Sequence, residues 1–289
     1  LGLVLNGELD TTDEIIDSLA RVVREHVDLS KLIELAHTAP ALNCSDFTGG
    51  SKVDFTLHKK KVDAPKIGVI KDQSFSFYYP ENLEALVDAG ATLEYIDSLN
   101  NSSLPPDLDG LYIGGGFPEV FASELEKNCT FRAEVRLAAE QGLPLYAECG
   151  GLMYLGRSIS TQEGKFEMVG LLPYDVTMTA KPQGHGYTIL KPCESNFWFD
   201  QAQQLKGHEF HNSKVINLAS DVSYAFEVQK GHGLDGNYDG ICYKNVLATY
   251  NHIHALGCPA WAHRFVQLAQ EFKNAKWSNK QSLYCGSTA

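Results

Sequence analysis

The fold of this chain is decided by the stretch Leu143-Pro144-Leu145-Tyr146-Ala147-Glu148-Cys149-Gly150-Gly151-Leu152-Met153-Tyr154-Leu155. In it, a short apolar run ends at Cys149, and two glycines then begin a helical pattern. This pattern predicts a strand, a sharp turn and a helix, the arrangement that exposes a nucleophile at the top of a sheet. The tight turn favours glycine, and the N-terminus of the helix favours a thiolate. We therefore predict that Cys149 is a nucleophile in acyl transfer, although a free cysteine is more often a small buried apolar residue.

Composition narrows the class of protein. The 289 residues are enough for about two domains or one large one, and a hydrophobic content of 44% supports a folded core. The 36 acidic residues outnumber the 24 basic ones and give a formal net charge of −12, so we expect no nucleic-acid partner. No apolar run is long enough to span a membrane. The seven cysteines form no C-x-x-C pair, which predicts neither a metal site nor a disulfide framework and favours a cytoplasmic location.

The N-terminal part is predicted to be separate from the rest. Its helical pattern is interrupted near Asp28 or Ser30, either of which is suited to cap a second helix. Residues 1–42 are therefore interpreted as a helical tail or connector, and the polar residues 43–65 as a linker. Since the chain starts at Leu1 without methionine, we expect it to belong to a longer protein.

Residues 66–273 are predicted to form an α/β domain. Strands alternate with helices in its first half, which predicts a parallel sheet with right-handed crossovers. From about residue 165 to 255, short β-like runs broken by glycine predict an antiparallel or mixed extension. A helix is predicted at 258–273, and residues 274–289 are expected to be a loose polar tail. The predicted early strands are 66–70, 92–96, 111–113 and 143–147, the early helices 80–90, 118–127 and 131–141, and the later β-like runs 187–190, 215–217, 223–228, 240–243 and 246–250.

A nucleophilic cysteine requires an oxyanion hole and a base. The sequence Gly114-Gly115-Gly116-Phe117-Pro118-Glu119 follows a predicted strand, so its amides, with that of Gly150, are candidates for the oxyanion hole. An ordinary strand–helix turn is the alternative. The candidate base lies in Ala248-Thr249-Tyr250-Asn251-His252-Ile253-His254, at a predicted strand end. If that strand continues, His252 and His254 share one face, because side chains in a strand alternate with a period of two.

Several segments together resemble the cobyrinic acid a,c-diamide synthase family, within its C-terminal class I glutamine amidotransferase domain. The resemblance extends over about residues 66–272, and it implies a flavodoxin-like mixed sheet flanked by helices. Residues 1–42 resemble the end of the family's ATP-dependent synthetase domain. The segments that carry the resemblance are Phe75–Leu83, Tyr112–Glu119, Ala147–Leu155, Gly207–His211 and Ala248–His254.

The resemblance implies a two-step reaction. Glutamine is hydrolysed through a glutamyl thioester, and the ammonia passes to the synthetase domain. There ATP activates the a and c side-chain carboxylates of a tetrapyrrole, which is cobyrinate or a sirohydrochlorin or sirohaem relative, for amidation in cobalamin or related cofactor biosynthesis. The matching site residues are Cys149 as nucleophile, His252 or alternatively His254 as base, and Gly115 or Gly116 with Gly150 at the oxyanion hole.

Two features depart from the general amidotransferase pattern. Those enzymes usually have a glutamate two residues after the histidine, whereas this chain has His254, as the cobyrinate branch does, so the orienting group is left unassigned. The chain also lacks a G-x-x-x-x-G-K-[ST] phosphate loop. We therefore expect ATP and Mg²⁺ to bind in a synthetase domain outside this chain, and no cofactor to bind here. A homodimer is expected from general frequency alone.

One further segment is Gly207-His208-Glu209-Phe210-His211. Its histidines are three apart in a β-rich region, not four apart on a helix as in zinc proteases, so no metal site is predicted. The resemblance places His208, Glu209 and His211 in a loop near the domain junction or the active site; the alternative is a turn with polar residues. Two other functions stay open: another Cys–His hydrolase or peptidase of similar fold, and a non-catalytic amidotransferase-like domain.

Overall fold

A computed structural model gives the structure of the chain and describes residues 12–40 and 63–285. Side chains at the C-terminal end are described up to residue 276. The chain divides into two compact units, Leu1–Lys59 and Lys60–Ala289, and each is described by itself.

Within its described residues, 12–40, the first unit contains two helices, at the positions where the sequence predicts them. They are α1 (Thr12–His26) and α2 (Leu29–His37), separated at Asp28. The side chain of Asp28 accepts a hydrogen bond of 3.0 Å from a backbone amide in the first turn of α2. Asp28, rather than Ser30, is therefore the N-cap of α2. Most of the predicted linker, residues 43–62, lies outside the described residues.

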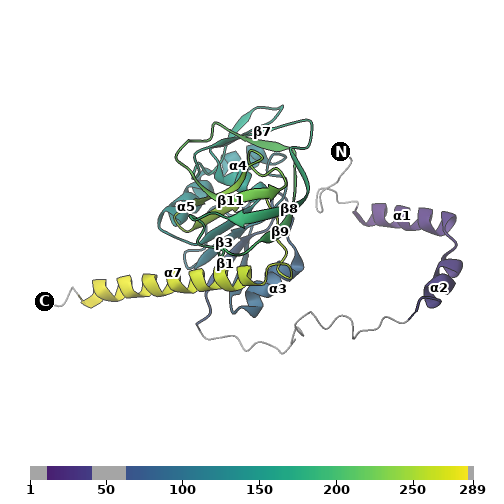
Figure 1. Cartoon of the computed structure of the whole chain (residues 1–289), viewed down its shortest axis with the longest axis horizontal. Helices are drawn as coiled ribbons and strands as arrows, with labels where there is room; N and C mark the ends of the chain where they lie inside the picture. Colours follow the sequence, from purple (N-terminus) through teal and green to yellow (C-terminus); the bar gives the residue numbers. More distant parts are fainter. Residues whose placement is uncertain (1–11, 41–62, 286–289) are drawn as a thin grey trace. The chain divides into compact units, whose positions relative to one another are not determined.

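A mixed nine-stranded sheet forms the centre of the second unit (Figure 1). The first five strands in spatial order are mutually parallel, and the other four are added antiparallel. The predicted parallel half and antiparallel extension are thus confirmed. In spatial order the strands are β2 (Thr92–Ile96), β1 (Lys66–Ile70), β3 (Gly110–Ile113), β4 (Leu145–Glu148), β13 (Val246–Thr249), β12 (Tyr238–Tyr243), β11 (Ser223–Lys230), β8 (Gly184–Pro192) and β9 (Leu205–His211).

A second, four-stranded sheet is absent from the sequence-based prediction except for one strand. Its strands are only three or four residues long, too short for an alternating pattern to stand out in the sequence. In spatial order they are β10 (Ser213–Ile216), β7 (Asp175–Met178), β5 (Ser158–Ser160) and β6 (Lys165–Glu167).

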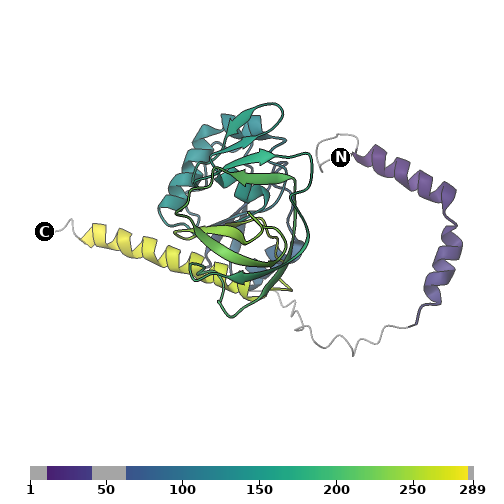
Figure 2. The ribbon, with the colours of Figure 1, turned by 45° about the horizontal axis from the view of Figure 1, so that its top comes forward.

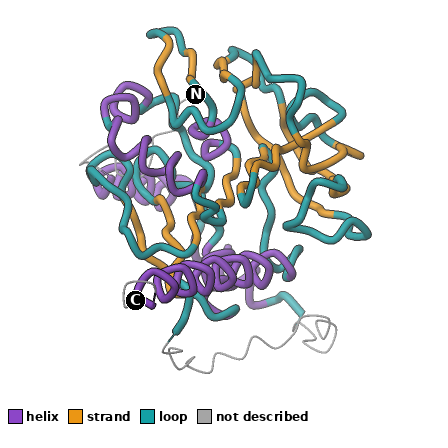
Figure 3. Tube along the Cα trace, turned by 90° about the vertical axis from the view of Figure 1, so that its left-hand side faces the viewer, coloured by secondary structure: helices purple, strands orange, loops and turns teal. Residues whose placement is uncertain are grey.

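Helices cover both faces of the large sheet. Figures 1 and 2 show α4 and α5 on one side of the strands and α7 on the other. Figure 3 shows α7 as a long helix lying along one side of the strands. The helices of this unit are α3 (Pro80–Asp88), α4 (Ala122–Lys127), α5 (Cys129–Glu140), α6 (Gly150–Leu155) and α7 (Ala260–Cys285).

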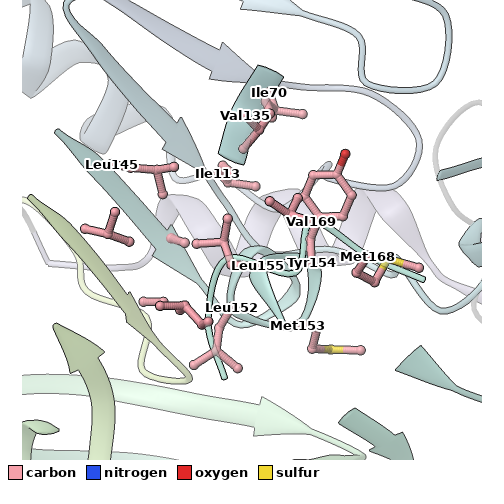
Figure 4. Close-up of a cluster of buried hydrophobic side chains, with 14 of the residues drawn as sticks. Ile70, Ile113, Val135, Leu145, Leu152, Met153, Tyr154, Leu155, Met168 and Val169 are labelled. Atoms are coloured by element: carbon pink, nitrogen blue, oxygen red, sulfur yellow. The ribbon is translucent and has the colours of Figure 1, made fainter. Parts of the chain in front are cut away.

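Alternating side chains of the central strands build a core on each face of the sheet. On one face, Ile113 and Leu145 meet Leu152 and Leu155 of α6, as Figure 4 shows. On the other face, aromatic rings dominate, and the ring centroids of Tyr112 on β3 and of Trp261 on α7 lie 5.5 Å apart. The two cores hold β3 and β4 rigidly, and the elbow that follows β4 is therefore supported from both sides.

The C-terminal helix is longer than predicted. The sequence predicts a helix at 258–273 and a loose tail at 274–289, but α7 continues to Cys285. Residues 274–285 contain neither glycine nor proline, so nothing in the backbone stops the helix. Lys273 and Lys276 also tie the helix to the domain, since they donate hydrogen bonds of 3.0 and 2.7 Å to the backbone carbonyls of Ala64 and Leu108, in the segments before β1 and β3.

Candidate active site

Cys149 occupies the predicted elbow between β4 and α6. Its backbone φ is 47°, an unusual value for a residue with a side chain. A Cβ at Gly151 would collide with the carbonyl oxygen of Ile113, so the turn accepts only glycine there. The amide of Cys149 donates a hydrogen bond of 2.8 Å to the carbonyl of Thr249 at the end of β13. The strand–elbow–helix prediction is confirmed, and the thiol is aimed by a strained, well-supported turn.

His252 reaches Cys149 through the pairing of two parallel strands. β13 lies beside β4 with Thr249 opposite Glu148, so the residues after both strands emerge at the same sheet edge. The backbone of His252 then forms a two-bond bridge to His208 on β9, with N–O distances of 2.8 and 3.1 Å. Its ring is buried and lines, with Cys149, a cavity of about 500 Å³.

The electrostatics of the site favour a charged imidazole at neutral pH. Burial lowers the pKa of His252, but the neighbouring Cys149 and Glu148 outweigh burial and raise the pKa to about 10. The ring of His208 stacks on that of His252 at a centroid distance of 5.0 Å. Burial and the charge of His252 lower the pKa of His208, so the two stacked rings do not both carry a positive charge near neutral pH.

The structure separates the two candidate bases. β13 ends at Thr249, so the period-two argument that would place His252 and His254 on one face does not apply. His254 instead lies 3.5 Å from the carboxylate of Glu81 and packs its ring against Tyr79. About a third of its side chain is exposed, at 34%, and it is not among the residues that line the cavity. The geometry therefore brings His252, and not His254, to the thiol.

The three candidate oxyanion-hole glycines lie around the same point. A Cβ built on Gly150 would come within 3.0 Å of the amide nitrogen of Gly116, so these two backbones run side by side. A Cβ built on Gly115 would come within 2.6 Å of the Cε1 atom of His252. The absence of side chains at these positions lets two backbone segments and the imidazole approach each other closely.

The segment containing His208, Glu209 and His211 is placed differently from both expectations. It belongs to β9, a strand, and is neither a loop nor a turn. His208 and Glu209 line the cavity that contains Cys149 and His252, so the segment lies at the candidate site. His211 is buried and stacks on Tyr250, with ring centroids 3.7 Å apart. This strand was not predicted because four of its seven residues are charged or histidine. Such a polar composition does not show the alternation of apolar and polar residues by which a strand is recognised in a sequence.

Glu209 anchors a neighbouring turn. Burial raises its pKa, but the nearby His211 ring and hydrogen bonds from the amides of Gly233 and His232 outweigh burial and lower it. The two amide contacts measure 2.6 and 2.8 Å. The carboxylate therefore fixes the end of β9 beside the cavity.

Two buried acids near the site were missed by reasoning from the sequence. Glu148, at the end of β4, lies 3.5 Å from Nδ1 of His252. Asp239, on β12, accepts hydrogen bonds of 3.1 Å from the amides of Tyr250 and Asn251, which lead into His252. An acidic residue ending an apolar strand next to a nucleophile was a visible signal for Glu148. The sequence around Asp239 carried no such signal, because Asp239 bonds to backbone amides of the residues before His252 and not to the histidine itself.

Exposed aromatic rings border the mouth of the cavity. Phe77, Tyr187 and Phe210 line it and leave much of their side chains exposed to solvent.

Among the residues that the structure describes, no cluster of three or more His, Cys, Asp or Glu is arranged to hold a metal ion. In the same residues, no helix is both long and apolar enough to cross a membrane.

The fold and the position of the site define a class of protein. Two solved structures share the arrangement: PurLQS from Thermotoga maritima and a protein described as a glutamine amidotransferase. The first has a TM-score of 0.52 at 18% identity and covers 74% of this chain and 99% of its own. The second has a TM-score of 0.53 at 19% identity and covers 71% of this chain and 98% of its own. The fold is that of a class I glutamine amidotransferase, with a flavodoxin-like sheet.

Sequence comparison narrows the class to a family. Residues 66–259 match the CobB/CobQ-like glutamine amidotransferase domain. A cobyrinate a,c-diamide synthase of Archaeoglobus fulgidus is 46% identical over 276 residues, covering 94% of this chain and 57% of the relative. One from Magnetococcus marinus is 40% identical and covers 91% of this chain and 56% of the relative. The chain belongs to the CobB/CobQ-like amidotransferase family, and it spans slightly more than half the length of these curated relatives.

Proposed function

We propose that this chain is the glutaminase part of an ATP- and glutamine-dependent enzyme that amidates the a and c side-chain carboxylates of a tetrapyrrole. One observation carries the proposal: a single cavity contains Cys149 on its elbow and the buried His252, in a chain 46% identical to a cobyrinate a,c-diamide synthase. The proposed tetrapyrrole is cobyrinate or a sirohydrochlorin or sirohaem relative, in cobalamin or related cofactor biosynthesis.

The first half of the proposed reaction forms a thioester. An imidazolium beside a thiol favours the thiolate, so Cys149 Sγ attacks the side-chain amide carbon of glutamine. The oxygen of that amide becomes negative and is stabilised by the amides of Gly116 and Gly150. His252 then donates its proton to the leaving nitrogen, the carbon–nitrogen bond breaks, and ammonia and a glutamyl thioester result.

The second half regenerates the enzyme. Neutral His252 accepts a proton from a water molecule, whose oxygen attacks the thioester carbon. The carbon–sulfur bond breaks, glutamate leaves, and the thiolate–imidazolium pair of Cys149 and His252 is restored. His252 thus acts first as an acid and then as a base, a role that its position beside the thiol supports.

The cavity suits a small polar substrate. Its volume of about 500 Å³ lies in the range of small-molecule sites. Its walls combine aromatic rings with a few polar groups, among them the side chains of His208 and Glu209. We propose that glutamine is bound here and that the tetrapyrrole is bound elsewhere, in the synthetase part.

The ATP-dependent amidation of the tetrapyrrole needs a synthetase domain in addition to this chain. This chain contains no phosphate-loop sequence, so ATP and Mg²⁺ are proposed to bind in the N-terminal synthetase domain, which is the proposed partner and acceptor of ammonia.

A cytoplasmic location is proposed as well, since Cys129, Cys149, Cys193, Cys242 and Cys258 are all free thiols. The predicted homodimer stays a prediction, which the molar mass in solution tests.

The test is a glutaminase assay on the complete protein with its synthetase part, ATP, Mg²⁺ and each candidate tetrapyrrole. We expect glutamate release stimulated by one of the tetrapyrroles and abolished by Cys149→Ala. The matched control is Cys129→Ala, which removes an exposed thiol on α5 and is expected to keep full activity. Glutamate release that survives in Cys149→Ala, or cleavage of peptides in its place, would overturn the proposal.

A further inference from the structure

Glu148 occupies the position that an orienting carboxylate needs. We infer that Glu148, the residue directly before the nucleophile, is the positioning carboxylate of this site and replaces the glutamate that class I amidotransferases place two residues after the histidine. The inference deepens the proposed function and rests on it, because it assigns a role in the same reaction. In this role Glu148 does not touch the substrate but acts on the reaction through His252.

The geometry of the carboxylate supports this role. Oε2 of Glu148 lies 3.5 Å from Nδ1 of His252, and both side chains are at most 5% exposed. Nδ1 has no closer hydrogen-bond partner among the residues that the structure describes. A carboxylate on Nδ1 fixes the tautomer and the orientation that leave Nε2 free to exchange a proton with the nucleophile, as in Ser-His-Asp triads.

Glu148 is itself held in place. Oε2 accepts a hydrogen bond of 3.1 Å from the hydroxyl of Tyr112, and Oε1 accepts one of 3.3 Å from the amide of Ile253. The amide contact joins the carboxylate to the residue that directly follows His252. One carboxylate therefore contacts both the ring and the backbone of the segment that carries the base.

The fold explains why this position can substitute for the usual one. β4 and β13 are parallel neighbours with Glu148 opposite Thr249, so the last residue of β4 faces the segment that leaves β13. Glu148 contacts Tyr112, which belongs to the core on one face of the sheet, whereas Cys149 belongs to the core on the other face. The thiol and the carboxylate thus reach the imidazole from two sides, although they are neighbours in sequence. His254, at the usual position of the glutamate, pairs with Glu81 outside the cavity.

The surrounding titratable groups leave Glu148 as the acid that acts on His252. Burial raises the pKa of the neighbouring tyrosines, so they are neutral near pH 7. The pKa of His208 is lowered by burial, and that ring is neutral as well. The titratable groups that face Glu148 or His252 are Tyr78 and Tyr79 before α3, Tyr112 on β3, Tyr146 on β4, Cys149 on the elbow and His208 on β9.

The test is the titration of His252 with and without the carboxylate charge. Glu148→Gln keeps the size of the side chain and removes the charge, and histidine-selective ¹⁵N NMR on the chain follows each ring as the pH is changed. We expect the pKa of His252 to fall by about one unit or more in Glu148→Gln. The matched control is Glu81→Gln, which removes a carboxylate at the same 3.5 Å from a histidine but outside the cavity. It is expected to leave the titration of His252 unchanged.

Kinetics add a readout that a purely structural role would not give. In the complete protein, Glu148→Gln is expected to lower kcat for glutamine hydrolysis by up to about 10⁴-fold, by analogy with the loss of the orienting carboxylate in a Ser-His-Asp triad. KM for glutamine is expected to change little, since Glu148 is absent from the cavity lining. Glu148→Asp, which restores the charge at a greater distance, is expected to recover part of kcat. A Glu148→Gln enzyme with wild-type kcat and a wild-type His252 titration would overturn the inference.

The unsubstituted chain provides a test even if Glu148→Gln does not fold. A His252 pKa at or below the ordinary 6.5 in the unsubstituted chain would be enough to reject the role of Glu148. The titration needs no glutamine, so its outcome is independent of the proposed function. A protein without glutaminase activity but with a raised His252 pKa that depends on Glu148 would refute the function and leave the carboxylate's electrostatic role standing.

Discussion

The substitution Gly115→Ala tests the close packing around the proposed base. A Cβ at this position lies 2.6 Å from Cε1 of His252 and 3.3 Å from Cδ1 of Phe77. Ordinary contacts between carbon atoms begin at about 3.5 Å, so the imidazole must move by about 1 Å. His252 cannot move as a whole without breaking its two backbone hydrogen bonds to His208, of 2.8 and 3.1 Å. The ring therefore has to rotate, and its alignment with the thiol is lost.

The magnitude follows from this displacement. A misplacement of about 1 Å in a catalytic group can cost about 100-fold in rate, so we expect kcat for glutamine hydrolysis to fall by about that factor. The added methyl group is also expected to lower the free energy of unfolding by about 1–3 kcal/mol, the usual cost of overpacking. Gly257→Ala is the matched control, because its new Cβ meets nothing closer than 3.4 Å.

The assay combines steady-state glutamate release with chemical denaturation of both variants. Gly257→Ala is expected to keep kcat within about twofold and to unfold like the wild type, since surface substitutions usually change stability by less than about 0.5 kcal/mol. If Gly115→Ala folds normally and keeps wild-type kcat, the reasoning that a clamped imidazole sets the rate is refuted.

Three further predictions concern stability and the choice of base. Burial would raise the pKa of Asp175, but hydrogen bonds from Ser158 and Asn217 outweigh burial and lower the pKa from 3.8 to about 2. The resulting stabilisation of the fold is present above about pH 4 and is lost as the pH falls toward 2. Asp175→Asn should therefore weaken the pH dependence of the free energy of unfolding between about pH 4 and 2, and an unchanged dependence would contradict this prediction. Trp261→Ala should lower the free energy of unfolding by about 3–5 kcal/mol in urea denaturation, because the ring is fully buried against the sheet; a loss below about 1 kcal/mol would show that α7 is dispensable for the core. His254→Asn should keep glutaminase activity within about threefold, since this partly exposed ring lies outside the cavity lining; a loss as large as that of a His252→Asn variant would return the role of base to His254.

Local signals in the sequence predicted most of the parallel half of the fold. The elbow was predictable because a buried strand, a cysteine and two glycines follow each other within a few residues, and Gly151 is required by a close backbone contact. The helix break at Asp28 was predictable because a cap is a local hydrogen bond. His252 and His254 were both visible as candidates, but their distinction depended on where β13 ends, which no local pattern fixes.

Longer-range features escaped prediction for physical reasons. The role of Glu148 depends on the parallel pairing of β4 with β13, and that pairing joins segments about a hundred residues apart in the chain. Asp239 instead holds amides just past the end of the neighbouring strand, and these contacts depend on the pairing of β12 with β13. β9 was hidden by its polar composition. The end of α7 escaped prediction because a polar composition alone does not distinguish a helix from coil.

Covalent labelling shows whether Cys149 is the nucleophile of a glutamine site. The protein is treated with 6-diazo-5-oxo-L-norleucine, a glutamine analogue that alkylates a nucleophile held at the amide position, and the modified peptide is identified by mass spectrometry. We expect one label, on Cys149, that excess glutamine prevents and that the Glu148→Gln variant acquires more slowly. A label on another cysteine, or no label on a folded protein with its synthetase part present, would contradict this assignment.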